Sequence, residues 1–231
     1  MKITYLRHSG FLVELEQVWL LFDYYRGEIP EFPKGKKGYV FVSHRHIDHF
    51  NKEIFNFLKK QNNITFVLSD DIWEKRIPEE AKEQTLLMKP EEERSVDDIC
   101  IRTLRSTDEG VAFLVSAEGK TIYHAGDLND WYWKEESEDW NQEMSANFRK
   151  YIEPLRDREI DAAFIPLDPR QEEYYTLGMD YFLELAKPEK VYPVHFWRKP
   201  EIIERWLEEH PQSQDRDRIV RITEEGELFD Q

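Results

Sequence analysis

The sequence predicts a mixed α/β fold, and three observations lead to this prediction. Short apolar runs with the composition of strands alternate along the chain with helix-like segments. Hydrophobic residues make up 40% and aromatic residues 14% of the chain, which is typical of globular proteins. The length of 231 residues suits one domain with a full core. We therefore expect residues 1–231 to form a single domain.

Charge and cysteine content narrow the possible functions. Lys and Arg number 32 and Asp and Glu 48, so the formal charge is −16. Such a charge repels polyanions, and we expect no nucleic-acid partner. The single Cys100 cannot form an intramolecular disulfide. No N-terminal signal pattern and no apolar run near the roughly 18 residues of a membrane span are seen. We expect a cytoplasmic protein with no membrane partner.

The first strands are predicted from short apolar runs near the N-terminus, at Ile3–Leu6, Phe11–Leu15 and Trp19–Phe22. His8 lies between the first two, where either a hydrogen-bonded turn residue or a substrate contact fits. Further strands are predicted at 38–42, 64–69, 85–88, 99–104, 111–115, 120–127, 160–168, 190–195 and 219–223. Helices are predicted at 52–58, 70–76, 134–149, 179–186 and 202–210, and residues 90–98 are predicted to be a charged turn region.

A cluster of histidines follows the predicted strand 38–42 and precedes the helix-like segment 52–58. Three imidazoles and one carboxylate fall within six residues, in the run His44-Arg45-His46-Ile47-Asp48-His49. In extended backbone, His44 and His46 point the same way. Imidazole and carboxylate together suit zinc, and iron or manganese less selectively. The cluster therefore predicts a metal site.

The pattern His44-x-His46-x-Asp48-His49 resembles the signature of the metallo-β-lactamase-fold hydrolases. The resemblance implies a four-layer αββα sandwich, in which two mixed sheets stack face to face with helices outside. It also implies two divalent metal ions, with His44 and His46 on the first and Asp48 and His49 on the second. Asp48 would also steer the proton of the nucleophile. Asp23, at the end of its strand, would orient a ligand histidine or simply cap the strand.

The segment before the strand 111–115 departs from the family pattern. Members of the family usually have a histidine just before this glycine-led strand, and this chain has none there. Asp108, two residues before Gly110, is the expected substitute ligand, and Glu109 is its rival. A first site with only the two histidines and the bridging residue is a third alternative. A carboxylate at this position would shift metal preference from zinc towards manganese or iron.

The later strand ends supply the remaining residues that the resemblance implies. Asp127, which ends Tyr123-His124-Ala125-Gly126-Asp127, would bridge the two ions, and this sequence is similar to the L-ascorbate-6-phosphate lactonase branch. His124 is expected to pack behind the ligands. His195 would complete the second site. Asp168 and Arg170 fall where family members often hold substrate, and Arg170 suits a carboxylate or phosphate. A salt bridge from Arg170 to a nearby glutamate is the alternative.

These observations predict a metal-dependent hydrolase that uses a metal-activated water on a small-molecule ester, lactone or phosphodiester. Zinc is the expected metal, with manganese or iron as alternatives. Two other functions remain open: a non-catalytic binding protein that retained the fold, and an iron-dependent oxidoreductase on the same fold.

Overall fold

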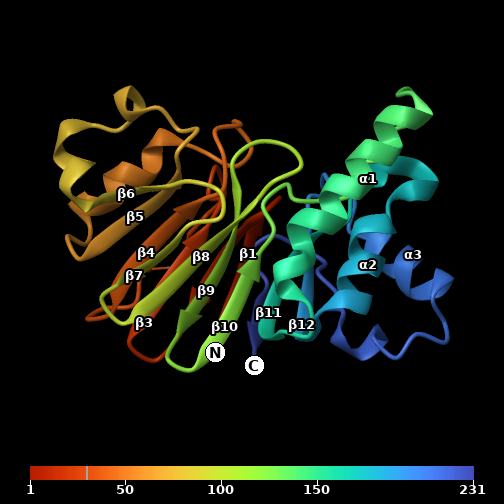
Figure 1. The fold of residues 1–231 in the computed structure, drawn as a ribbon. Coiled ribbons are helices and arrows are strands. Elements are labelled where there is room, and N and C mark those ends of the chain that lie inside the picture. Colours follow the sequence, from red (N-terminus) through yellow and green to blue (C-terminus); the bar gives the residue numbers. More distant parts are fainter. Residues whose placement is uncertain (30) are drawn as a thin grey trace.

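The computed structural model describes residues 1–29 and 31–231, which form two stacked sheets (Figure 1). The first sheet has seven strands in the order β13-β1-β2-β3-β4-β5-β6. β3, β4, β5 and β6 run parallel to one another, and the remaining pairs are antiparallel. Its strands are β1 (Lys2–Arg7), β2 (Gly10–Glu14), β3 (Val18–Phe22), β4 (Lys37–Val42), β5 (Ile64–Ser69), β6 (Thr85–Met88) and β13 (Leu228–Asp230).

The second sheet has six strands in the order β12-β11-β10-β9-β8-β7. β10, β11 and β12 are parallel, whereas β7, β8 and β9 pair antiparallel. Its strands are β7 (Glu93–Val96), β8 (Ile99–Arg105), β9 (Val111–Ala117), β10 (Lys120–His124), β11 (Glu159–Pro166) and β12 (Lys187–Val194). Both sheets are therefore mixed, as expected.

Helices cover the outer faces of both sheets. α1 (Glu138–Ile152), α2 (Leu177–Leu185) and α3 (Glu201–Glu209) gather beside β11 and β12 (Figure 1). The outer face of the first sheet packs on 3-10 turns, chiefly η1 (Lys52–Lys59), which buries Ile54, Phe55 and Phe57. The other short turns are η2 (Glu74–Arg76), η3 (Glu79–Gln84), η4 (Glu153–Leu155), η5 (Pro169–Tyr174) and η6 (Arg216–Arg218). This arrangement is the predicted four-layer sandwich.

Inner strands such as β4 are apolar on both faces because the sheets are buried on both sides there. In β4, Tyr39 and Phe41 face the core between the sheets, whereas Val40 and Val42 face η1. Successive side chains of a strand point to opposite faces, so a sheet covered on both sides requires an unbroken apolar run. No helix among the described residues is long and apolar enough to cross a membrane.

Two strand predictions differ from the structure, and the predicted helix 70–76 is reduced to the 3-10 turn η2. The charged segment 90–98 was expected to be a turn but contains β7, an exposed edge strand paired with β8. Charged residues are common on edge strands, so the composition concealed the strand. The segment 219–223 was expected to be the last strand, yet only Ile219 makes an isolated bridge, to Val191. The terminal strand is β13, which pairs with β1.

Candidate metal centre

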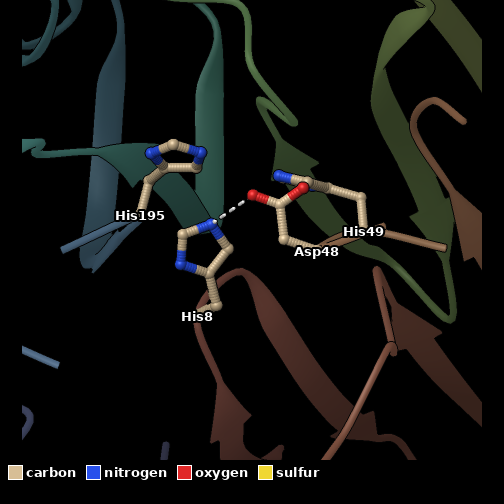
Figure 2. A group of neighbouring side chains, drawn as sticks. All are labelled: His8, Asp48, His49 and His195. Carbon is tan, nitrogen blue, oxygen red and sulfur yellow. Dashed lines mark ion pairs between the residues drawn. The ribbon is translucent and has the colours of Figure 1, made fainter. Parts of the chain in front are cut away.

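Polar residues from both sheets meet at one edge of the sandwich, where several strands end. The loop after β4 carries His44, His46, Asp48 and His49, and His8 lies in the turn between β1 and β2. From the second sheet come Asp108, between β8 and β9, Asp127 after β10 and His195 after β12. Their ligand-type atoms form two groups, each within 4.8 Å: His8, Asp48, His49 and His195, and His44, His46, Asp108 and Asp127. Figure 2 shows the first group converging on one space.

The distances within these groups leave room for an ion. Asp127 faces His49 Nε2 at 3.3 Å, His195 Nε2 at 3.4 Å and His44 Nε2 at 3.6 Å. These distances exceed the usual length of a hydrogen bond. Two ligand atoms bound tetrahedrally to zinc at about 2.1 Å would be about 3.4 Å apart. The spacing therefore fits atoms that share a metal ion rather than a proton.

Several buried polar atoms here have no hydrogen-bond partner among the described residues. They include His8 Nε2, His44 Nε2, His49 Nε2 and Asp127 Oδ1. A buried polar atom without a partner costs about 1–3 kcal/mol, so such atoms are rarely left together in a folded protein. Divalent cations at the two groups would satisfy the imidazole nitrogens of His44 and His49 and the Asp127 oxygen, and the residues present fit a metal centre.

Asp23 fixes the orientation of two of these imidazoles. Its Oδ2 lies 2.7 Å from His49 Nδ1 and accepts a hydrogen bond from Ser43 Oγ at 2.6 Å. Because the Ser43 hydroxyl gives its only proton to Asp23, it accepts from His44 Nδ1, 2.9 Å away. His44 and His49 are thus held with Nδ1 towards Ser43 and Asp23, and with Nε2 towards Asp127. Asp23 lies behind the candidate ligands, the position expected from the sequence.

Asp168 fixes the orientation of His195. Asp168 was expected to contact substrate, so the structure differs from the prediction here. Its fully buried carboxylate accepts from His195 Nδ1 at 2.9 Å, from Trp197 Nε1 at 3.2 Å and from Arg170. No part of this carboxylate is left open to a ligand. The sequence placed Asp168 at a polar strand end but could not show that His195 would cover it.

His124 is buried beside this network and does not face the cavity. Its Nε2 lies 2.8 Å from the Ser9 carbonyl oxygen, and its Nδ1 accepts from the Gly126 amide at 3.1 Å. Burial lowers the pKa of His124, so the ring is neutral. The structure places it behind the candidate ligands, as expected.

Asp108 and Glu109 both lie near His46. Asp108 Oδ2 is 3.4 Å from His46 Nδ1, and Glu109 Oε2 is 3.4 Å from His46 Nε2. Glu109 is also paired with Arg45, whereas Asp108 belongs to the group that contains Asp127. The geometry favours Asp108 over Glu109 as the carboxylate that joins His44, His46 and Asp127.

His8 belongs to the site, although the sequence favoured a simple turn residue. Its Nε2 lies 3.4 Å from Asp48 Oδ2, and its ring centre lies 4.2 Å from that of His195. Its backbone is left-handed, with φ of 55°, because the chain turns there between β1 and β2. A lone histidine in a turn carries no spacing pattern, so the sequence offered only its place beside a strand end.

Two glycines allow the strand ends to pack this closely. A Cβ atom on Gly110 would lie 2.0 Å from the Ser43 carbonyl oxygen, and one on Gly126 would lie 2.6 Å from Ser43 Cβ. Both residues have positive φ, a conformation that costs other residues energy. The two glycines thereby bring the second sheet against the residue that precedes His44.

The charges at the site favour a cation. Burial lowers the pKa of His8 to about 4 and that of His44 to about 3, so both rings are neutral at pH 7. Burial opposes the charge of His195 too, but Asp127 and Asp168 outweigh it and raise its pKa to about 10. Burial and the nearby Asp127 raise the pKa of Asp108. Burial raises the pKa of Asp127, but the charges of His195 and His49 outweigh it and hold that pKa well below its usual value. A divalent ion bound here would take the place of the protons on these imidazoles.

A cavity of about 390 Å³ opens over these residues. Its lining includes both aromatic side chains and candidate ligands. Such a volume holds a small molecule. The lining residues are His46, Asp48, Thr107, Asp108, Asp127, Trp131, Trp133, Trp140, Met144, Arg170, His195 and Trp197.

Comparison with known families agrees with this geometry. A family described as the beta-lactamase superfamily domain matches residues 2–140, more than half of the chain. This chain belongs to that superfamily. The match contains the His44–His49 cluster, Asp108 and Asp127, and the resemblance inferred from that cluster is confirmed at the level of the superfamily.

Individual relatives in the superfamily extend the similarity beyond residue 140. A "UPF0173 metal-dependent hydrolase" of Opitutus terrae is 27% identical over 222 residues, covering 87% of each chain. Igni18, a metallo hydrolase from Ignicoccus hospitalis, has a TM-score of 0.66 at 19% identity and covers 99% of this chain and 98% of its own. CmlA, a diiron beta-hydroxylase from Streptomyces venezuelae, has a TM-score of 0.57 at 10% identity, covering 84% of this chain and 44% of its own. The last two likenesses show a shared fold.

Proposed function

We propose that this protein is a metal-dependent hydrolase acting on a small molecule with an ester, lactone or phosphodiester bond. The observation that carries the proposal is the pair of ligand groups that meet around Asp127 at the floor of the cavity. Membership of the superfamily and a relative named as a metal-dependent hydrolase support it. The similarity of Tyr123–Asp127 to the lactonase branch makes lactones the first substrates to test. We propose that the whole chain acts as one domain.

In this proposal the two ions have separate ligand sets. His44, His46 and Asp108 would hold one ion, and Asp48, His49 and His195 would hold the other, with Asp127 close enough to contribute to both. Zinc is the first choice, and the carboxylate of Asp108 makes manganese or iron the alternatives. A divalent ion at such a site lowers the pKa of a water and polarises the bond under attack.

The residues of the chain orient the reactants around that chemistry. Asp48 lines the cavity with one carboxylate oxygen 3.4 Å from His8, and we propose that it accepts the proton of the attacking water. Burial raises the pKa of Asp48, but the contact with His8 and the charge of His49 outweigh it, and the pKa lies below its usual value. Asp48 is therefore ionised at neutral pH. Trp131 donates to the Asp127 carbonyl oxygen at 2.8 Å, which fixes its indole ring in the lining of the cavity.

The test combines turnover with metal content. Protein loaded separately with zinc, manganese and iron is assayed on a panel of lactones, esters and phosphodiesters. Asp127→Ala is expected to abolish turnover and to bind less metal by elemental analysis. Asp161→Asn is the matched control, because Asp161 lies on the same sheet and pairs with Lys120 away from the cavity. Unchanged metal content in Asp127→Ala would contradict the bridging role. No turnover with any metal would favour a non-catalytic binding protein.

A second candidate is an iron-dependent oxidoreductase. Asp108 adds a carboxylate to a group that already contains Asp127, and carboxylate-rich sites suit iron better than histidine-rich sites do. The fold likeness to a diiron beta-hydroxylase shows that this architecture also occurs outside hydrolases. Iron as the main metal in freshly purified protein, with no hydrolysis of the panel, would favour this candidate.

A further inference from the structure

Beside the candidate ligands, the lining of the cavity combines aromatic rings with one cation. Trp131, Trp133 and Trp140 lie on the segment after β10 and the start of α1, and Trp197 follows β12. Trp131 and Trp133 are stacked, with ring centres 5.7 Å apart and planes at 3°. Arg170 is the cation. We call these four tryptophans and Arg170 the aromatic wall.

Arg170 is held in place and is still accessible. Its Cζ lies 4.6 Å from the ring centre of Trp197 and 5.6 Å from that of Trp133, within the range of cation–π contacts. Nε and Nη2 donate to Asp168, while Nη1 donates to none of the described residues. The side chain is 47% exposed. The expected alternative, a salt bridge to Glu172 or Glu173, is not seen, because both pair with Lys134.

Asp168 connects this guanidinium to the candidate metal centre. The same carboxylate accepts from Arg170, from Trp197 and from His195. Arg170, His195 and the four tryptophans line the same cavity. An anionic group on the free Nη1 edge of Arg170 would therefore share that cavity with the candidate ligands, and the rings would contact the apolar part of the molecule. Tryptophan faces give large contact area to flat apolar groups with little loss of side-chain freedom.

We propose that the aromatic wall binds a small organic anion, with a carboxylate, phosphate or sulfonate group on Arg170 and an apolar or aromatic body against the tryptophans. This deepens the proposed hydrolase function, because it assigns a substrate class to the same cavity. The acidic chain as a whole disfavours anions, so Arg170 and the ions would provide the local attraction. The volume of about 390 Å³ limits the ligand to a small molecule.

The test measures binding with sulfonates, which are weak metal ligands. Benzenesulfonate carries both ring and anion, methanesulfonate only the anion, and benzyl alcohol only the ring, while benzyltrimethylammonium reverses the charge. Four of the seven tryptophans line the cavity, so intrinsic fluorescence reports on its occupancy, and calorimetry gives the affinity. Each titration uses the full chain loaded with zinc and again after chelation. Benzenesulfonate is expected to bind at least about tenfold more tightly than the other three probes.

Three variants identify the residues responsible. Arg170→Gln is expected to weaken benzenesulfonate binding by at least about tenfold. Arg205→Gln, the matched control, should not change it, because Arg205 also lies 4.6 Å from an aromatic ring, that of Tyr175, and pairs with an acid, Glu209, outside the cavity. Trp140→Leu should weaken benzenesulfonate but not methanesulfonate. Trp140 makes no hydrogen bond to Asp168. Replacing it therefore leaves intact the hydrogen bond by which Asp168 orients His195.

The binding measurements can be interpreted independently of the turnover measured in the hydrolase test. Unchanged benzenesulfonate affinity in both Arg170→Gln and Trp140→Leu would overturn the assignment, as would tighter binding of benzyltrimethylammonium. Binding that persists after chelation and is lost in Arg170→Gln would support it even if no substrate of the panel is hydrolysed. Binding lost on chelation and unaffected by Arg170→Gln would place the anion on the metal and overturn the proposal.

Discussion

His8 Nε2 lies 3.4 Å from Asp48 Oδ2, and no other described residue donates a hydrogen bond to this buried nitrogen or accepts one from it (Figure 2). The ring is also in contact with His195 and Trp197, with ring centres 4.2 Å and 4.7 Å away. His8 thus joins the loop after β4 to the end of β12, which come from different sheets.

Replacing His8 should weaken the second ion selectively. His8→Asn suits the left-handed backbone at this position, because asparagine tolerates positive φ. We expect the affinity for the more weakly bound ion to fall about 10- to 100-fold, with the first ion retained. A cobalt titration followed by absorbance measures the affinities of both sites. His210→Asn is the matched control, since His210 also lies 3.4 Å from an aspartate, Asp180, outside the cavity. Equal cobalt affinities in parent and His8→Asn would show that His8 supports neither ion.

Asp108 and Glu109 can be distinguished by metal stoichiometry. Asp108→Ala should empty the first site and leave the second, because it removes the carboxylate grouped with His44 and His46. Asp108→His should strengthen zinc binding relative to manganese, since imidazole is the softer ligand. Glu109→Gln is the control and should leave stoichiometry unchanged, because Glu109 pairs with Arg45. Elemental analysis after identical zinc loading measures the zinc content of each protein. Zinc lost only in Glu109→Gln would show that Glu109, and not Asp108, is the ligand.

Asp23→Asn should lower both metal affinity and stability. The amide has one acceptor oxygen, so it cannot receive the Ser43 amide, the Ser43 hydroxyl and the His49 ring as the carboxylate does. We expect metal affinity to fall about 10- to 100-fold. The unsatisfied buried groups should lower the free energy of unfolding by about 1–3 kcal/mol, measured on chelated protein in urea. A variant that unfolds at the same urea concentration and binds zinc equally well would show that Asp23 only caps its strand.

Gly110→Ala should destabilise the protein more than Gly119→Ala. Both positions have positive φ, at 67° and 74°, so each substitution carries a backbone cost of about 1–2 kcal/mol. Nothing lies within 4 Å of a Cβ at Gly119, whereas one at Gly110 would meet Ser43 and His44. We expect an additional loss of about 1–3 kcal/mol at Gly110 from overpacking, measured by urea unfolding. Equal losses of unfolding free energy in the two variants would show that the backbone around Gly110 shifts to accommodate a methyl group without a measurable energy penalty.

Residues that form a dense local pattern could be predicted from the sequence, and isolated ones could not. The spacing of His44, His46, Asp48 and His49 indicated a metal site, and Asp127 and His195 followed at strand ends in the expected order. His8 has no such pattern, and its role depends on the packing of two sheets. Asp168 was recognised as polar and close to the site, but whether it faces a ligand or His195 depends on tertiary packing.

The strands were predicted best where they are buried. Apolar runs such as β4 and β9 are unmistakable because both of their faces are covered. β7 and β13 lie at sheet edges with exposed or half-buried side chains, so their composition resembles that of turns.

The division of the candidate ligands between the two sheets has a consequence for folding kinetics. His8 and the His44–His49 loop leave the first sheet, and Asp108, Asp127 and His195 leave the second. A chain in which the sheets have formed but not yet docked presents no complete chelating set. The ions would thus add their binding free energy after docking, beyond the transition state for that step. Interactions absent from the transition state slow unfolding and leave the folding rate nearly unchanged. Metal would therefore lengthen the lifetime of the native state without hastening its formation.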